Sequence, residues 1–176
     1  MILIDGVATV EPDIATCHPR LLCVLAGLDL PFHEKSFDFY AELGRNVPTS
    51  IDRDLIKTAF GIMICAPTKL SAIRAWAQEL RIAGLGGGHK FAERTLSAMS
   101  EAMPRLERYF FTGIGLRLQN MDAQICANIQ GYCRQRGIVC LSIHDGFRVR
   151  SEDNQLVEEL MEEEVSAMCK RAWADL

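Results

Sequence analysis

The chain has 176 residues, of which 49% are hydrophobic and 24% charged, a composition typical of a globular protein with one domain. No apolar run reaches the roughly 18 residues of a membrane-spanning helix, and the first residues do not resemble a signal peptide, so we expect a cytoplasmic protein without a membrane partner. Its seven scattered cysteines form no C-x-x-C pair, which predicts reduced core thiols rather than a zinc site or disulfide framework.

The net charge of −4 is unevenly distributed along the chain. Residues 40–120 carry eleven Lys and Arg against seven Asp and Glu, whereas the remainder carries eight against sixteen. A local excess of positive charge attracts phosphate groups. The alternative interpretation is an ordinary solvated helical surface.

The pattern of the first half of the chain predicts one strand followed by helices. Residues rich in β-branched side chains predict a strand over 2–10, before Pro12. Residues 29–50 are turn-rich and are expected to be irregular. Apolar residues at helical spacing predict helices over residues 14–28, 52–65 and 69–83.

The second half predicts helices around one hairpin. Helical spacing covers residues 91–103 and 117–136, with a short turn or helix near 107–111. A buried strand is expected over 138–143, and the turn at 144–146 leads into a returning strand over 147–150. An amphipathic helix over 152–173, with an acidic face, ends the chain. Trp76 and Trp173 lie on apolar helical stripes and are expected in the core.

Together these elements predict an α+β fold. A small antiparallel sheet would combine the strand over 2–10 with the hairpin over 138–150. Helices over 14–28, 117–136 and 152–173 would back this sheet, and the segment 40–112 would form a separate helical lobe.

Two aspartates stand out because of their settings. Asp13 lies just past the first strand, and Asp145 lies at the tip of the hairpin. If those strands share one sheet, both carboxylates emerge at the same edge, where they repel each other unless cations neutralise them. Oxygen ligands suit Mg²⁺ or Mn²⁺. Taken alone, however, turn aspartates are more often solvated surface residues.

Three short motifs, in order along the chain, resemble motifs A, B and C of family A DNA polymerases. The first covers 13–22, where Asp13 is followed by a turn, a helix and Arg20. The second covers 53–61, with Arg53 and Lys57 one helical turn apart and Phe60 before a glycine. The third is the His-Asp hairpin tip within 142–147. The similarity spans nearly the whole chain.

This resemblance implies a palm over residues 1–39 and 113–176 and reduced fingers over 40–112, without thumb or exonuclease. It implies template-directed nucleotidyl transfer between a nucleoside triphosphate and a primer 3′-hydroxyl, with two Mg²⁺ or Mn²⁺ ions on Asp13 and Asp145. Primer-template nucleic acid would be the partner, and a second protein would supply thumb-like grip. His144 would position the hairpin or the primer terminus.

The resemblance also implies substrate contacts, in two groups. The nucleotide-binding residues would be His18, Arg53, Lys57 and Phe60, of which Lys57 would also act in catalysis. The nucleic-acid-binding residues would be Arg20, Arg117 and Gln119.

Several positions depart from the family pattern. His18 stands where DNA-polymerising members carry a glutamate that supports exclusion of a ribose 2′-hydroxyl. The tyrosine expected after Gly61 is absent, and the spacing from Lys57 to Phe60 is one residue short. Gly146 replaces an acidic or hydroxyl residue after Asp145. The sequence leaves open whether the sugar is ribose or deoxyribose.

The sequence is also compatible with two alternative functions. One is a catalytically weak or inactive palm relic that binds nucleic acid as an accessory module of a replication system. The other is an unrelated α+β protein, either a metal-dependent phosphohydrolase or a structural protein.

Overall fold

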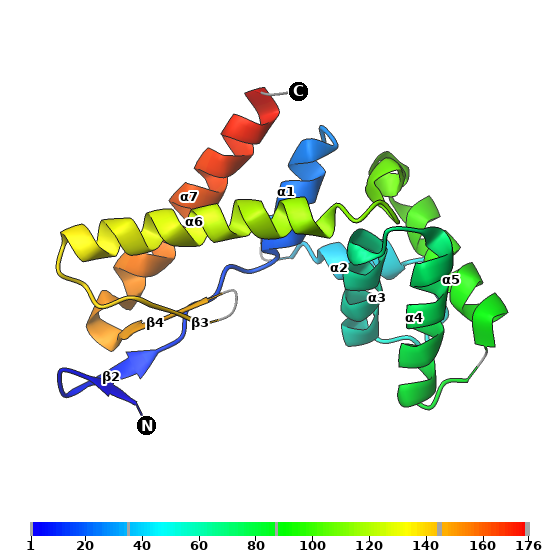
Figure 1. Cartoon of the computed structure of the whole chain (residues 1–176), viewed down its shortest axis with the longest axis horizontal. Coiled ribbons are helices and arrows are strands. Elements are labelled where there is room, and N and C mark those ends of the chain that lie inside the picture. Colours follow the sequence, from blue (N-terminus) through cyan, green and yellow to red (C-terminus); the bar gives the residue numbers. More distant parts are fainter. Residues whose placement is uncertain (1, 35, 87, 144–145, 175–176) are drawn as a thin grey trace. The chain divides into compact units, whose positions relative to one another are not determined.

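The computed structural model describes residues 2–34, 36–86, 88–143 and 146–174, without the side chains of the last two. Its helices and single four-stranded antiparallel sheet confirm the predicted α+β class (Figure 1). The chain divides into two compact units. The first unit comprises residues 1–27 and 118–176, and the second comprises residues 28–117. The sequence places the corresponding boundaries after residues 39 and 112.

The sheet lies in the first unit and has the strand order β1-β2-β4-β3. Its strands are β1 (Leu3–Ile4), β2 (Val7–Val10), β3 (Leu141–Ile143) and β4 (Gly146–Arg150). The central strand β4 pairs with β2 through Val149 opposite Val10, and with β3 through Phe147 opposite Ser142. Phe147 and Val149 are fully buried. The hairpin predicted near the end of the chain therefore pairs with the first strands.

Two predictions about these strands are wrong. The segment 2–10 is a hairpin rather than one strand, because Asp5 and Gly6 both adopt positive φ and reverse the chain, as a two-residue turn between paired strands requires. The segment 138–143 is not a buried strand. The strand there is β3 alone, which lies at the edge of the sheet beside β4, and its first residue, Leu141, is 50% exposed.

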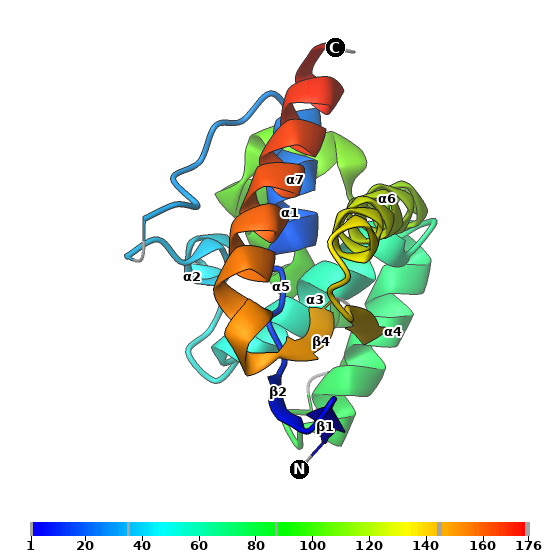
Figure 2. The same ribbon diagram turned by 90° about the vertical axis from the view of Figure 1, so that its left-hand side faces the viewer.

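The first unit also contains three long helices, α1 (Cys17–Leu25), α6 (Gly115–Gln135), which begins just before the boundary, and α7 (Asn154–Ala174). Helix α1 packs along α7 (Figure 2). Its residues Leu21, Leu22 and Leu25 are completely or almost completely buried, so this contact is an apolar core. A short 3-10 turn, η2 (Ser151–Asp153), connects β4 to α7.

The second unit consists of helices. They are α2 (Phe39–Gly44), α3 (Arg53–Cys65), α4 (Lys69–Ile82), α5 (Gly88–Ala102) and the 3-10 helix η1 (Pro104–Tyr109). Helix α2 lies inside the segment predicted to be irregular. It forms because Asp38 caps it, accepting hydrogen bonds from the backbone N–H groups of Tyr40 and Ala41.

The core of the second unit is built around Trp76 of α4, which is fully buried as predicted. Its indole Nε1 donates a hydrogen bond of 2.7 Å to Oγ1 of Thr95 in α5, and that hydroxyl donates to the Ala92 carbonyl at 2.9 Å. The polar edge of the ring is thus satisfied inside the core. The side chain of Trp173 lies outside the described residues.

Across the part of the chain that the structure describes, no helix has the length and apolar character needed to cross a membrane. The seven cysteines are free thiols, and Cys17, Cys23 and Cys133 are buried. Cys65, at the end of α3, is exposed and is not part of the core.

Candidate functional site

The chain beyond β2 stays next to β4 as far as Asp13. The N–H of Phe147 donates a hydrogen bond of 2.9 Å to the Pro12 carbonyl. Asp13 then forms an isolated antiparallel bridge with Gly146, the residue that follows Asp145 in the sequence. The segments that resemble motifs A and C, more than 130 residues apart in the chain, therefore approach each other where Asp13 pairs with the first residue of β4.

Gly146 makes this approach possible because it lacks a side chain. A Cβ atom at this position would lie 2.7 Å from the Pro12 carbonyl oxygen and 3.3 Å from both Cα and Cβ of Asp13. The first of these separations is shorter than any normal contact between carbon and oxygen. The obstacle is backbone, which cannot rotate out of the way as a side chain can.

The side chain of Asp13 is exposed and forms no hydrogen bond or ion pair with any residue that the structure describes. No described residue occupies its two oxygens, which are of the type that a hard cation such as Mg²⁺ binds. His144 and Asp145 lie outside the described residues. Among the described side chains, no group of three or more His, Cys, Asp or Glu residues gathers at a distance suited to a metal ion.

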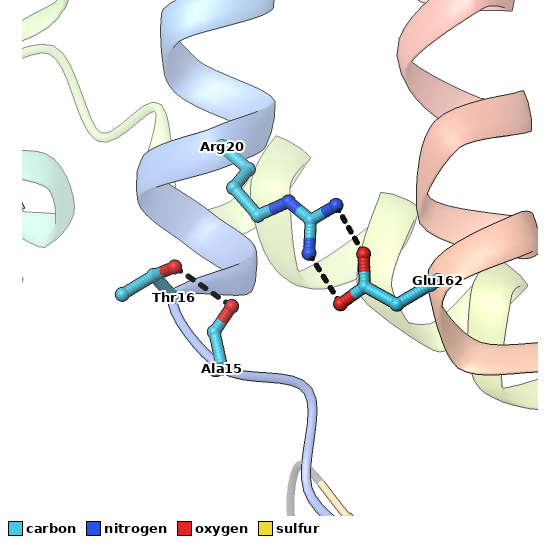
Figure 3. Close-up of polar contacts among 4 residues, drawn as sticks. All are labelled: Ala15, Thr16, Arg20 and Glu162. Carbon is cyan, nitrogen blue, oxygen red and sulfur yellow. Dashed lines mark hydrogen bonds and ion pairs between the residues drawn. The ribbon is translucent and has the colours of Figure 1, made fainter. Parts of the chain in front are cut away.

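The short loop after Asp13 ends in a strained residue. Thr16 adopts φ of 53°, in the left-handed region that β-branched residues avoid. Its hydroxyl donates to the Ala15 carbonyl at 2.7 Å rather than capping α1 (Figure 3). Because Thr16 breaks the helical conformation, α1 starts at Cys17 and not at residue 14 as predicted. His18 follows in the first turn of α1 and is half-buried.

Arg20 in α1 forms a two-pronged ion pair with Glu162 in α7 (Figure 3). The two guanidinium nitrogens donate at 2.9 and 2.7 Å, and the arginine side chain is only 17% exposed. This hydrogen bonding holds the pKa of Glu162 below its ordinary value. Arg20 therefore joins two helices of the first unit, and a contact with nucleic acid at this position would compete with Glu162.

One acidic residue near α1 has no counterpart in the sequence-based prediction. The Cys17 thiol donates to Oδ1 of Asp122 in α6 at 3.4 Å. Burial, together with the neighbouring carboxylate, raises the pKa of Cys17 far above its ordinary value, so this thiol is not a nucleophile. Only the packing of α6 near α1 reveals this pair, because the two residues are 105 positions apart.

In the second unit, α3 carries the residues that resemble motif B. Arg53 donates from Nε to Oδ2 of Asp38 at 2.5 Å, and its guanidinium carbon lies 5.2 Å from the centre of the Tyr40 ring. The hydrogen bond from Arg53 is the main cause that lowers the pKa of the Asp38 carboxyl. Arg53 therefore stabilises the start of α2, which Asp38 caps.

Phe60 and Lys57 differ sharply in exposure. Phe60 is 2% exposed, with its ring centre 5.3 Å from that of Phe39 and 6.0 Å from that of Tyr40. It occupies a core position, so its ring is covered by the chain's own aromatic side chains and is not exposed to a nucleotide base. Lys57 is exposed and makes no hydrogen bond or ion pair within the described part of the chain.

Arg117 and Gln119 lie near the start of α6, and both are exposed. Neither forms a side-chain hydrogen bond or ion pair with another described residue. Both are therefore available to a partner molecule.

Two hollows of the second unit lie apart from the predicted residues. One has a volume of about 520 Å³ and is bordered by Asn46, Pro48 and the exposed side of α5, including Arg94. The other, of about 280 Å³, is apolar and lies between Leu28, Phe37 and Met103. Neither is lined by a residue that resembles motif B.

Comparisons of the chain with protein-family models, with curated proteins and with solved structures found no match in any of the three.

Proposed function

We propose that this chain is a nucleotidyl-transfer domain similar to the palm and fingers of family A DNA polymerases. The observation that carries the proposal is the backbone bridge between Asp13 and Gly146. It brings the motif A aspartate next to the residue that follows the motif C aspartate. Two carboxylates on adjoining backbone are what a divalent cation site of this kind needs.

The exposure of Asp13 supports the same proposal. An arginine would neutralise such a carboxylate, and backbone N–H groups would occupy its oxygens, whereas Asp13 has no such partner among the described residues. The donor chemistry therefore fits Mg²⁺ or Mn²⁺, with Asp13 and Asp145 as the protein ligands. Such ions, when bound, lower the pKa of a primer 3′-hydroxyl and neutralise charge on a triphosphate.

The other residues of the chain would act on the substrates. Lys57, an exposed ammonium group without a described partner, would bind the triphosphate of the incoming nucleotide and offset its negative charge. Arg117 and Gln119, both exposed, would contact the nucleic acid. His144 would position the primer terminus.

The test is primer extension on a primed template with Mg²⁺ or Mn²⁺. Wild-type protein is expected to extend the primer, and Asp13→Ala and Asp145→Ala are expected to abolish extension. Asp29→Ala removes an exposed aspartate of the second unit and serves as the matched control. Extension that persists unchanged in the Asp13 and Asp145 variants would defeat the assignment.

A second function, nucleic-acid binding with weak or no catalysis, is favoured by the intramolecular contacts of two expected nucleotide-binding residues. Arg53 is paired with Asp38, and Phe60 is buried. Under this alternative, the protein binds primed template with an affinity that falls steeply as salt rises. It does not extend the primer, and Asp13→Ala leaves the affinity unchanged.

A further inference from the structure

Gly146 is held between two neighbouring segments. On one side it pairs with Ile143 of β3, and on the other it bridges to Asp13. It is buried and its φ is not positive, so the turn conformation does not require glycine at this position. The requirement comes from the close approach of Pro12 and Asp13, described above.

We propose that Gly146 is a positioning residue, whose missing side chain sets the spacing between Asp13 and the hairpin that carries Asp145. This inference rests on the proposed function, because it assigns the spacing to a divalent cation site. A side chain at position 146, acidic or not, would displace the backbone of Pro12 and Asp13. The glycine found where the family carries an acidic or hydroxyl residue is therefore part of how this site is built.

The size of this displacement explains why Mg²⁺ binding would be sensitive to it. A Cβ placed 2.7 Å from the Pro12 oxygen forces a shift of several tenths of an ångström. Metal–ligand distances tolerate about 0.2 Å, and Mg²⁺ requires a nearly regular octahedron of oxygens at about 2.0–2.1 Å. Ca²⁺ accepts longer and more variable distances. Widening the site should therefore harm Mg²⁺ binding more than Ca²⁺ binding.

The experiment measures Mn²⁺ binding by electron paramagnetic resonance, with Mg²⁺ and Ca²⁺ as competitors and without nucleotide. Gly146→Ala is expected to weaken Mg²⁺ about tenfold or more, the range seen when supporting residues of a metal site are changed, and to weaken Ca²⁺ less. Gly131→Ala, on α6, is the matched control, because a Cβ there has no neighbour within 4 Å. Wild-type affinity in Gly146→Ala would overturn the proposal, as would an equal loss of Mg²⁺ and Ca²⁺.

If Gly146→Ala does not fold, a measurement on the wild-type protein tests the proposal instead. The Phe147 N–H, hydrogen-bonded to Pro12, reports whether the bridge is closed. If a cation bridges Asp13 and the hairpin, Mg²⁺ at 100 times its Kd should slow exchange of this amide by up to about 100-fold. Unchanged exchange at saturating Mg²⁺ would overturn the proposal.

Asp13→Asn separates this inference from the proposed function. The variant removes the charge while preserving the shape of the side chain. If Asp13→Asn loses metal binding and Gly146→Ala does not, only the positioning role fails. If Asp13→Asn binds Mg²⁺ like wild-type protein, the metal assignment and the proposed function both fail.

Discussion

The two units hold their expected functional residues by different contacts. In the first unit, Asp13 is exposed, has no described partner and is placed by a backbone bridge beside the first residue of β4. In the second unit, Arg53 is held by Asp38 and Phe60 is buried, so Lys57 is the residue of this motif that remains open. Arg20 of the first unit is engaged as well, by Glu162, so each of the two segments holds one exposed, unpaired residue and one paired arginine.

The difference shows that a motif match predicts residue type and order but not availability. Arginines and aromatic rings have large side chains that also satisfy nearby carboxylates and apolar cores. Because the aspartate side chain is short, an aspartate at the end of a strand reaches fewer partners within the chain. Among the described residues, Asp13 is thus left exposed and unpaired, whereas Arg53 and Phe60 are engaged within the second unit.

The largest expected effect tests whether the second unit depends on its own core. Trp76→Ala should destabilise the protein by about 3–5 kcal/mol, because it opens a large cavity and removes the indole donor from Thr95. Hydrogen exchange should accelerate in α3–α5 more than in β4. Ile82→Ala, on the same helix but 72% exposed, should have little effect on either. Equal acceleration in both regions would show that the two units unfold together as one cooperative unit, and the contrast between them would not hold.

An intermediate effect contrasts two cations of α3. Lys57→Ala should lower the efficiency of triphosphate use about 10- to 100-fold, the loss expected when one hydrogen bond to a charged group disappears, with no loss of stability. Arg53→Ala should chiefly reduce stability, because Asp38 loses its ion pair.

Steady-state kinetics with varied nucleoside triphosphate, together with urea unfolding of both variants, measures this contrast. Template affinity provides the internal control and should change little in Lys57→Ala. A reversed result, with kinetics sensitive to Arg53 and insensitive to Lys57, would refute the roles assigned from exposure.

The smallest effect concerns the ion pair between α1 and α7. Because Arg20 lowers the pKa of Glu162, the pair stabilises the protein above the ordinary glutamate pKa of about 4.3, and this contribution disappears as the pH falls through the lowered value. Glu162→Gln should cost at most about 1 kcal/mol at pH 7, since the glutamate is largely exposed.

Urea unfolding between pH 7 and pH 3 tests this prediction. The stability difference between wild type and Glu162→Gln should shrink towards zero at the acidic end. Glu163→Gln, next to it and exposed, should follow wild type throughout. A difference that grows as the pH falls would contradict the assigned pKa direction.

Much of the secondary structure was predictable because its signals are local. Apolar spacing located α3, α4, α6 and α7 within a few residues. Errors arose where local rules compete with one another. Asp5 and Gly6 form a turn inside an apparently continuous strand, and the Asp38 cap starts a helix in a segment rich in turn residues.

The sequence by itself determined the α+β class, the order of the elements and the residue types of the candidate site, because periodicity, caps and motifs involve neighbours in the chain. Only the tertiary structure decided which of those residues are exposed and without a partner in the chain. Arg20 meets Glu162 across 142 positions, and Asp13 meets Gly146 across a similar separation. Such contacts depend on how the strands and helices pack, which no local pattern encodes.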